Sequence, residues 1–121
     1  MKTVYSDLLT RLGLSLAEAA ELHGVGLSTV KHWASGRRGP SGGWDGLINE
    51  LRDYEAEIID RSEQFREIHE AQGFPALDIN ASEADPITRM AMVDFILTSD
   101  VAVHEGETDA TRMARQARRP Y

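Results

Sequence analysis

The feature that most constrains this chain is a long run of apolar residues at helical spacing in its middle. Residues 44–71 carry large apolar side chains three and four positions apart, which predicts one amphipathic helix of about seven turns that ends near Gly73. The members of this stripe are Trp44, Leu47, Ile48, Leu51, Tyr54, Ile58, Phe65 and Ile68. The residues before it are too few to cover a helix of this length, so the stripe must pack against another element or another chain.

Three shorter helical segments are expected ahead of the long one. Apolar spacing predicts a helix over 4–12 that closes at the following glycine. The sequence SLAE at 15–18 has the form of a capping box and predicts a second helix that ends at Gly24. The helical pattern resumes over 27–35 and closes at the next glycine, and the Gly- and Pro-rich stretch 37–43 must be a loop or hinge.

The part after Gly73 reads as one helix between two short extended segments. Residues 74–79 alternate and predict a short strand, and a further strand is expected over 101–103. Asp85 as cap and Pro86 at the first helical position predict a helix that runs on to Leu97. The end of the chain has helix-forming composition with little apolar surface, so a frayed helix or a disordered basic tail is expected over 108–121.

Composition removes several classes of function. The chain has no cysteine, which excludes a disulfide framework, a thiolate metal site and a cysteine nucleophile. The four histidines show no paired metal-ligand spacing, and no apolar run is long enough to span a bilayer. The first residues lack the pattern of a secretory signal. We therefore expect a soluble, cytoplasmic protein that is not an enzyme, with no metal, no cofactor, no membrane contact and no evident small-molecule ligand.

The net charge of −7 hides a strong asymmetry along the chain. Residues 1–40 carry five Lys and Arg against three acids, a net charge of +2, and residues 108–121 carry four arginines against one acid, a net charge of +3. Residues 41–107 carry four arginines against sixteen acids, a net charge of −12. Since phosphate contacts supply most non-specific affinity for nucleic acid, only the two ends of the chain suit a polyanionic partner.

Residues 15–36 form a unit of two short helices joined by a turn at 24–26. Small, aliphatic and aromatic residues fall where such a pair must touch, namely Ala19, Ala20, Val25, Val30 and Trp33. Packing of this kind leaves a short, polar and weakly basic outer face on the second helix, made of Leu27, Ser28, Thr29, Lys31, His32 and Ser35. The plainer alternative is an ordinary helical hairpin with a solvated outer face.

This unit resembles the helix-turn-helix of the phage repressor and Cro type, also called the xenobiotic-response-element family. The residues that carry the likeness are Ala20, Gly24, Val25, Val30, Trp33 and Gly36, and it covers about the first forty residues. Excisionase-like and small terminase heads share much of the pattern. Leu16 stands where the family often has a Gln that contacts a phosphate, and Gly26 stands where it favours Ser or Thr as a helix cap.

The resemblance implies double-stranded DNA as a partner and assigns the contacts. Leu27, Ser28 and His32 are expected to face base edges, with Leu27 against a thymine methyl group. Thr29 and Lys31 are then expected at the wall of the groove. Ser35, Arg37 and Arg38 are expected along phosphates.

The layout of the rest is similar, more distantly, to the anti-CRISPR-associated repressors, in which such a head leads into a long helix and a C-terminal strand-and-helix dimerisation part. The expectation is a mainly α-helical protein with a head at 1–40, an oligomerisation part at 44–107 and a basic tail at 108–121. It implies a homodimeric repressor that reads an inverted repeat and regulates its own gene. Two alternatives stay open: a phage packaging or excision factor, and an adaptor or antitoxin whose long helix binds a partner protein.

The dimer interface is expected on the apolar stripe of the long helix and on the helix that starts at Pro86. The residues assigned to it are Leu51, Tyr54, Ile58, Phe65, Met90 and Phe95. The acids along the long helix are interpreted as its solvated face and not as paired catalytic carboxylates, because they flank an unbroken apolar stripe; they are Glu50, Asp53, Glu55, Glu57, Asp60, Glu63, Glu67 and Glu70. The tail arginines Arg112, Arg115, Arg118 and Arg119 are left between contacts with DNA and contacts with this acidic helix.

Overall fold

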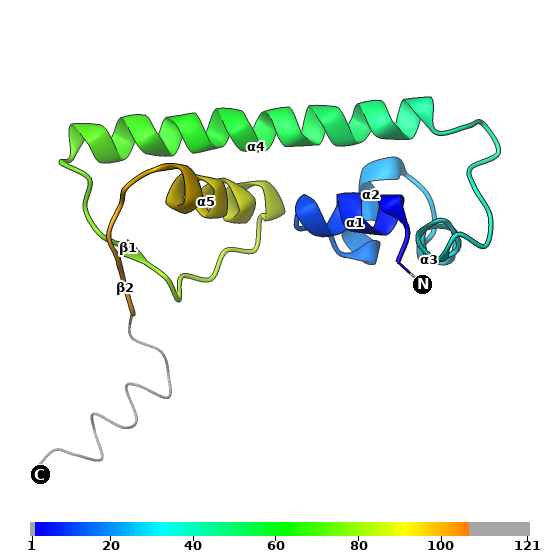
Figure 1. Cartoon of the computed structure of the whole chain (residues 1–121), viewed down its shortest axis with the longest axis horizontal. Helices are drawn as coiled ribbons and strands as arrows, with labels where there is room; N and C mark the ends of the chain where they lie inside the picture. Colours follow the sequence, from blue (N-terminus) through cyan, green and yellow to red (C-terminus); the bar gives the residue numbers. More distant parts are fainter. Residues whose placement is uncertain (1, 107–121) are drawn as a thin grey trace, which may run out of the picture.

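The computed structural model describes residues 2–106, and within them the chain is mainly helical, as predicted (Figure 1). The elements in chain order are α1 (Val4–Arg11), α2 (Leu16–His23), α3 (Leu27–Ser35), α4 (Asp45–Ala71), β1 (Leu77–Asp78), α5 (Pro86–Thr98) and β2 (Val103–His104). Helices α1 to α3 lie under the N-terminal half of α4, and α5 lies under its C-terminal half. The basic tail predicted at 108–121 lies outside the described residues.

Local capping bonds set the boundaries of the head helices. The Ser15 hydroxyl accepts from the Glu18 amide at 3.0 Å, and the Glu18 carboxylate accepts from the Ser15 amide at 2.9 Å, so the predicted capping box is confirmed. Helix α2 ends at Gly24, whose φ of 68° lies in the left-handed region that glycine adopts without strain. A second capping box, between Thr3 and Ser6, starts α1 and was not predicted.

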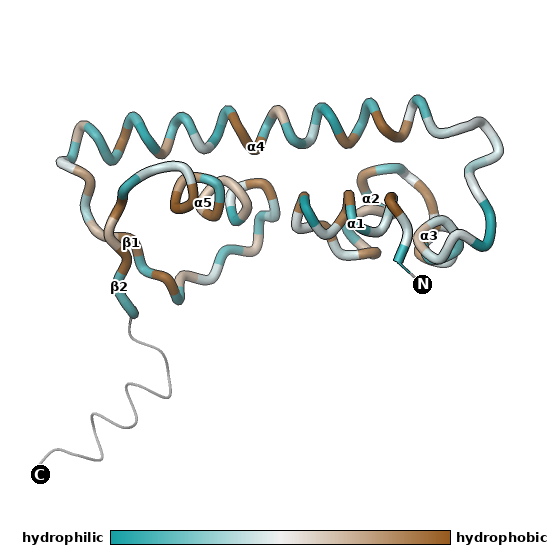
Figure 2. The backbone as a smooth tube through the Cα atoms, in the orientation of Figure 1, coloured by the Kyte–Doolittle hydropathy of each residue, from teal (hydrophilic) through white to brown (hydrophobic). Residues whose placement is uncertain are grey.

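Most of the stripe of α4 is covered by the chain's own elements, whereas Ile68 near its end is 51% exposed. Leu51, Tyr54 and Ile58 are buried in one core with residues of α1, α2 and α3, so a single core spans the expected boundary between head and long helix. Figure 2 shows apolar and polar stretches alternating along α4, as an amphipathic helix requires.

The predicted dimer interface is therefore wrong for most of its members. Leu51, Tyr54, Ile58 and Phe95 are buried within one chain, and Phe95 is 0% exposed, so these side chains offer no surface to a second copy. Phe65 and Met90 are half-buried. The physical reason is that α5 folds back on α4 and buries the apolar surface that the head leaves uncovered.

Helix α5 also contacts the head directly. The turn between α1 and α2 passes through Gly13, whose φ is +69°, and the thioether of Met90 lies where a side chain at this position would project. Arg89 of α5 pairs with Glu18 at 3.7 Å. These contacts fix α5 against the start of α2.

The two strands are shorter than predicted. β1 and β2 pair in parallel with only two residues each, Leu77 opposite Val103 and Asp78 opposite His104. The Asp78 carboxylate closes this small sheet, because it accepts from the amides of Asn80 at 2.9 Å and Gly106 at 2.7 Å.

The capping box of α2 leads to a prediction about pH. The bonds from Ser15 hold the pKa of Glu18 below its ordinary value, with further help from Arg89. A lowered folded-state pKa stabilises the protein above the ordinary pKa, and this contribution is lost as the pH falls through the lowered value. Glu18→Gln keeps a side-chain oxygen for the bond from the Ser15 amide but removes the negative charge. We expect this variant to be less stable than the wild type by up to about 1 kcal/mol near neutral pH.

The measurement is the free energy of unfolding by urea at a series of pH values. The difference between Glu18→Gln and wild type should shrink as the pH falls below the ordinary pKa of the carboxyl and disappear once the pH lies below the lowered pKa, because the wild-type carboxyl is then protonated as well. A difference that stayed constant down to pH of about 2 would show that the charge of Glu18 contributes nothing.

Candidate nucleic-acid interface

Helices α2 and α3 pack as the sequence predicts. Ala19, Ala20, Val30 and Trp33 are buried, and Val25 in the turn packs on the same core. The small alanines allow close contact between the two helices. The Val25 amide donates to the Ala20 carbonyl at 3.0 Å, and Gly26 then caps α3 in an extended conformation without a side-chain bond.

An aromatic cluster of Tyr5, His23, Trp33 and Trp44 fixes α3 from behind. The Trp33 ring meets Tyr5 edge-on at a centroid distance of 6.2 Å and Trp44 at 6.1 Å, while Tyr5 and Trp44 are 5.0 Å apart. Such tilted and edge-on pairs are the geometry that aromatic rings favour. The cluster links α1, α2 and α3 to the residue that precedes α4, so α3 cannot reorient without disturbing all of them.

Charged and polar groups tie the cluster to α4. The His23 side chain has no exposed surface, and its Nδ1 lies 3.0 Å from a carboxylate oxygen of Glu50. Burial raises the pKa of Tyr5 to about 12, and the nearby charge of Glu50 adds to the effect. Tyr5 therefore stays a neutral phenol over the physiological range. Sequence reasoning missed this cluster, because its members are brought together only by tertiary packing.

The residues assigned to DNA contact lie on the accessible side of α3 and in the loop after it. Leu27, Ser28, Lys31, Ser35, Arg37 and Arg38 are exposed, and Thr29 and His32 are half-buried. Ser28 and His32 are four residues apart and so lie one above the other on the helix. The arrangement presents one short polar face whose opposite side is anchored by Val30 and Trp33.

The charges along this stretch of the chain are of one sign. No Asp or Glu occurs between Glu21 and Asp45, while Lys31, Arg37 and Arg38 all fall in this interval. Within residues 2–106 none of these three cations forms an ion pair. Arg11, the other arginine of the head, differs, because it pairs with Glu55 at 3.2 Å. Three unpaired cations in an acid-free stretch suit a polyanion.

One expected phosphate contact, that of Ser35, is weakened in this geometry, and the position of the family's glutamine offers no polar group. The Ser35 hydroxyl donates to the His32 carbonyl at 3.1 Å, and a phosphate oxygen needs a donor. Leu16, at the position of the family's glutamine, is half-buried against the core. Arg37 and Arg38, which follow the left-handed cap at Gly36, are then the residues on which the expected phosphate contacts would rest.

No family model, curated protein or solved structure matches this chain. The resemblance of residues 15–36 to the repressor type thus stays a prediction carried by the residues themselves. Across residues 2–106 no group of three His, Asp or Glu side chains has the geometry of a metal site. In the same part of the chain, no helix combines the length and apolar character that crossing a bilayer requires.

Proposed function

We propose that this protein is a sequence-specific double-stranded DNA-binding repressor that acts as a homodimer on an inverted repeat. The observation that carries the proposal is the exposed polar face of α3, held on a buried base and set in an acid-free stretch that contains Lys31, Arg37 and Arg38. The net charge of −12 on residues 41–107 keeps the middle of the chain away from DNA.

The shape and chemistry of α3 suit the major groove, which is about 12 Å wide and admits one α-helix. Ser28 and His32 offer hydrogen-bonding groups to base edges, and exposed Leu27 suits a thymine methyl group. Arg37 and Arg38 carry no sequence information, and their role is to bind phosphates and fix the register of the helix.

A homodimer follows from the small size of this face. One helix of nine residues reads few base pairs, whereas two linked heads raise the effective concentration of the second contact and read two half-sites. Repression is proposed because residues 15–36 resemble the helix-turn-helix of phage repressors. The first duplex to test is the DNA upstream of its own coding sequence, since autoregulation is part of the proposal.

Ser28→Ala and His32→Ala are the direct test of readout. Each change is expected to weaken binding to the specific duplex by about 1–3 kcal/mol, because a base-edge hydrogen bond is lost. The melting temperature should change little, since neither side chain belongs to the buried core. Fluorescence anisotropy on specific and scrambled duplexes, beside thermal melts, measures both quantities.

Arg37→Ala is the matched control for a phosphate contact. It should weaken binding to specific and scrambled duplexes equally and reduce the salt dependence of binding by roughly one unit of slope. Specific affinity that is unchanged in both Ser28→Ala and His32→Ala would remove α3 as the reader. Failure to find any duplex preferred over scrambled DNA would overturn the proposed function itself.

A further inference from the structure

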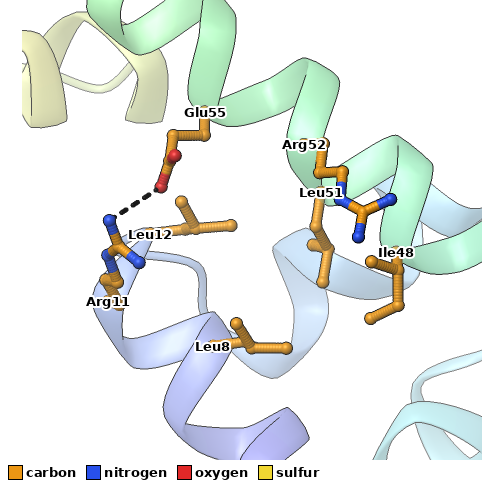
Figure 3. Close-up of a pocket in the computed structure, with 7 residues that line it drawn as sticks. All are labelled: Leu8, Arg11, Leu12, Ile48, Leu51, Arg52 and Glu55. Atoms are coloured by element: carbon orange, nitrogen blue, oxygen red, sulfur yellow. Dashed lines mark ion pairs between the residues drawn. The ribbon is translucent and has the colours of Figure 1, made fainter.

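A continuous groove runs along one side of α4, between that helix and the elements packed beneath it. Its first half, about 230 Å³ in volume, lies between α1 and α4 and is lined by Leu8, Leu12, Ile48, Leu51 and Arg52 together with an ion pair, Arg11 to Glu55 (Figure 3). Its second half, of about 280 Å³, lies where the end of α1 meets α4 and α5. Both halves share Arg11, Leu12 and Glu55, so they adjoin at the ion pair.

The second half of the groove exposes apolar side chains that a folded chain normally covers. Leu97 is 78% exposed, Ile59 is 49% exposed and Val93 is 40% exposed, and all three line the same hollow. Isolated exposed apolar residues are ordinary, but a contiguous group beside a groove is typical of an interaction surface.

The charges of the groove distinguish it from the rest of the molecule. Its lining contains Arg11 and Arg52 and also Glu55 and Asp94, so its net charge is zero in a chain whose net charge is −7. In the two hollows on the opposite side of α4 the lining includes acids, among them Glu50, Asp53 and Glu57, and no Lys or Arg. Two copies of this chain therefore repel each other through that side and not through the groove.

We propose that the groove binds a second copy of this chain, with the two α4 helices antiparallel. A two-fold interface uses the same surface on both copies, so the surface must be complementary to itself. Arg52 lies at the Ile48 end of the groove and Asp94 lies at the Leu97 end. An antiparallel two-fold close to Glu55 brings Arg52 of each copy to Asp94 of the other and packs the exposed apolar residues between them.

This arrangement also places the two heads on one side of the pair. Ile58 faces the core and Ile59 faces the groove, so the groove lies about 100° around α4 from the buried face. A two-fold axis that lies in the interface and is perpendicular to α4 reverses the direction of this helix in the second copy. Both heads then lie on the same side of the pair of α4 helices.

The spacing of the heads connects the groove to the proposed function, on which this step rests. Figure 1 shows α3 level with the N-terminal end of α4. Asp45 is ten residues from Glu55, about 15 Å along the helix, so a two-fold near Glu55 separates the two N-terminal ends by roughly 30 Å. Adjacent major grooves on one face of DNA are about 34 Å apart. The two recognition helices are thus placed for successive turns of the duplex.

A charge-reversal cycle on the full chain, without DNA, tests the groove. Arg52→Glu and Asp94→Arg should each raise the dimer dissociation constant at least about tenfold, because each puts like charges opposite one another. The double variant should return to within about threefold of the wild type, since the pair is restored in reverse. Sedimentation equilibrium measures the constants, and circular dichroism melts check that each variant is folded.

Leu97→Arg tests the apolar part and Ile79→Arg is its matched control. Leu97→Arg should weaken the dimer more than about tenfold by placing a charge in the interface, whereas exposed Ile79 lies outside the groove and its change should have no effect. The proposal is overturned if the wild type stays monomeric at about 100 μM, or if none of the groove variants changes the dimer dissociation constant. Duplex binding is measured separately. If the groove variants behave as expected but the protein prefers no duplex, only the proposed DNA-binding function is overturned.

Discussion

Trp33→Ala is expected to unfold the N-terminal head, with a loss of about 3–5 kcal/mol in the free energy of unfolding. Trp33 is 6% exposed and packs edge-on against Tyr5, His23 and Trp44. Its removal leaves a cavity where α1, α2, α3 and the start of α4 meet. A loss of this size is a large part of the 5–15 kcal/mol by which most proteins are stable, so the variant should lose binding to every duplex.

Urea unfolding followed by circular dichroism measures the loss, and Trp33→Phe is the matched control. Phenylalanine keeps an aromatic ring in the cluster, so its loss of stability should be clearly smaller than that of alanine. If the free energy of unfolding of Trp33→Ala were within about 1 kcal/mol of the wild-type value, the packing of α3 on the aromatic cluster would be incorrect. Ser28→Ala, on the outer face of the same helix, separates a loss of readout from a loss of fold.

The helix boundaries could be predicted because their signals are local. The capping box at Ser15 and Glu18 and the glycines at 24 and 36 fix the ends of α2 and α3 through bonds within a few residues. Asp85 and Pro86 do the same for α5. The outer face of α3 followed from the same periodicity, since Val30 and Trp33 had to point inward. Its contact with DNA remains a prediction from chemistry and resemblance.

The partner of the long stripe could not be predicted from periodicity. An apolar stripe shows that one side of α4 is buried, but the pattern is the same whether a second chain or a later helix covers it. Here the head covers the first half of the stripe and α5 covers most of the rest, so the groove offered to a second copy lies a quarter-turn away, at Ile59 and its neighbours. The His23–Glu50 contact was missed for the same reason, because it joins residues that are distant in the sequence.

Phe95→Ala is expected to release α5 from α4 while α1, α2 and α3 stay folded. Phe95 is 0% exposed, and its ring centroid lies 5.1 Å from that of His69. It does not belong to the core that the head shares with α4. Truncating a fully buried phenylalanine removes about 3–5 kcal/mol, and Phe95 is among the largest fully buried side chains, so the loss falls on the packing of α5 against α4.

Two readouts separate the parts of the molecule in this variant. Both tryptophans of the chain, Trp33 and Trp44, belong to the aromatic cluster, so tryptophan emission reports on the head and should stay native. Hydrogen exchange of the α5 amides should accelerate by at least about 100-fold. Because Val93, Asp94 and Leu97 of α5 line the groove, the variant should also sediment as a monomer.

Leu97→Ala is the control within the same helix, because its exposed side chain should change stability by no more than about 0.5 kcal/mol. It should still weaken the dimer, which distinguishes loss of the interface from loss of α5. Melting of head and α5 together in Phe95→Ala, with a red shift of tryptophan emission, would show that α4 couples the two halves into one cooperative unit. In that case the contacts of Met90 at Gly13 and of Arg89 with Glu18 would be the links that carry the coupling.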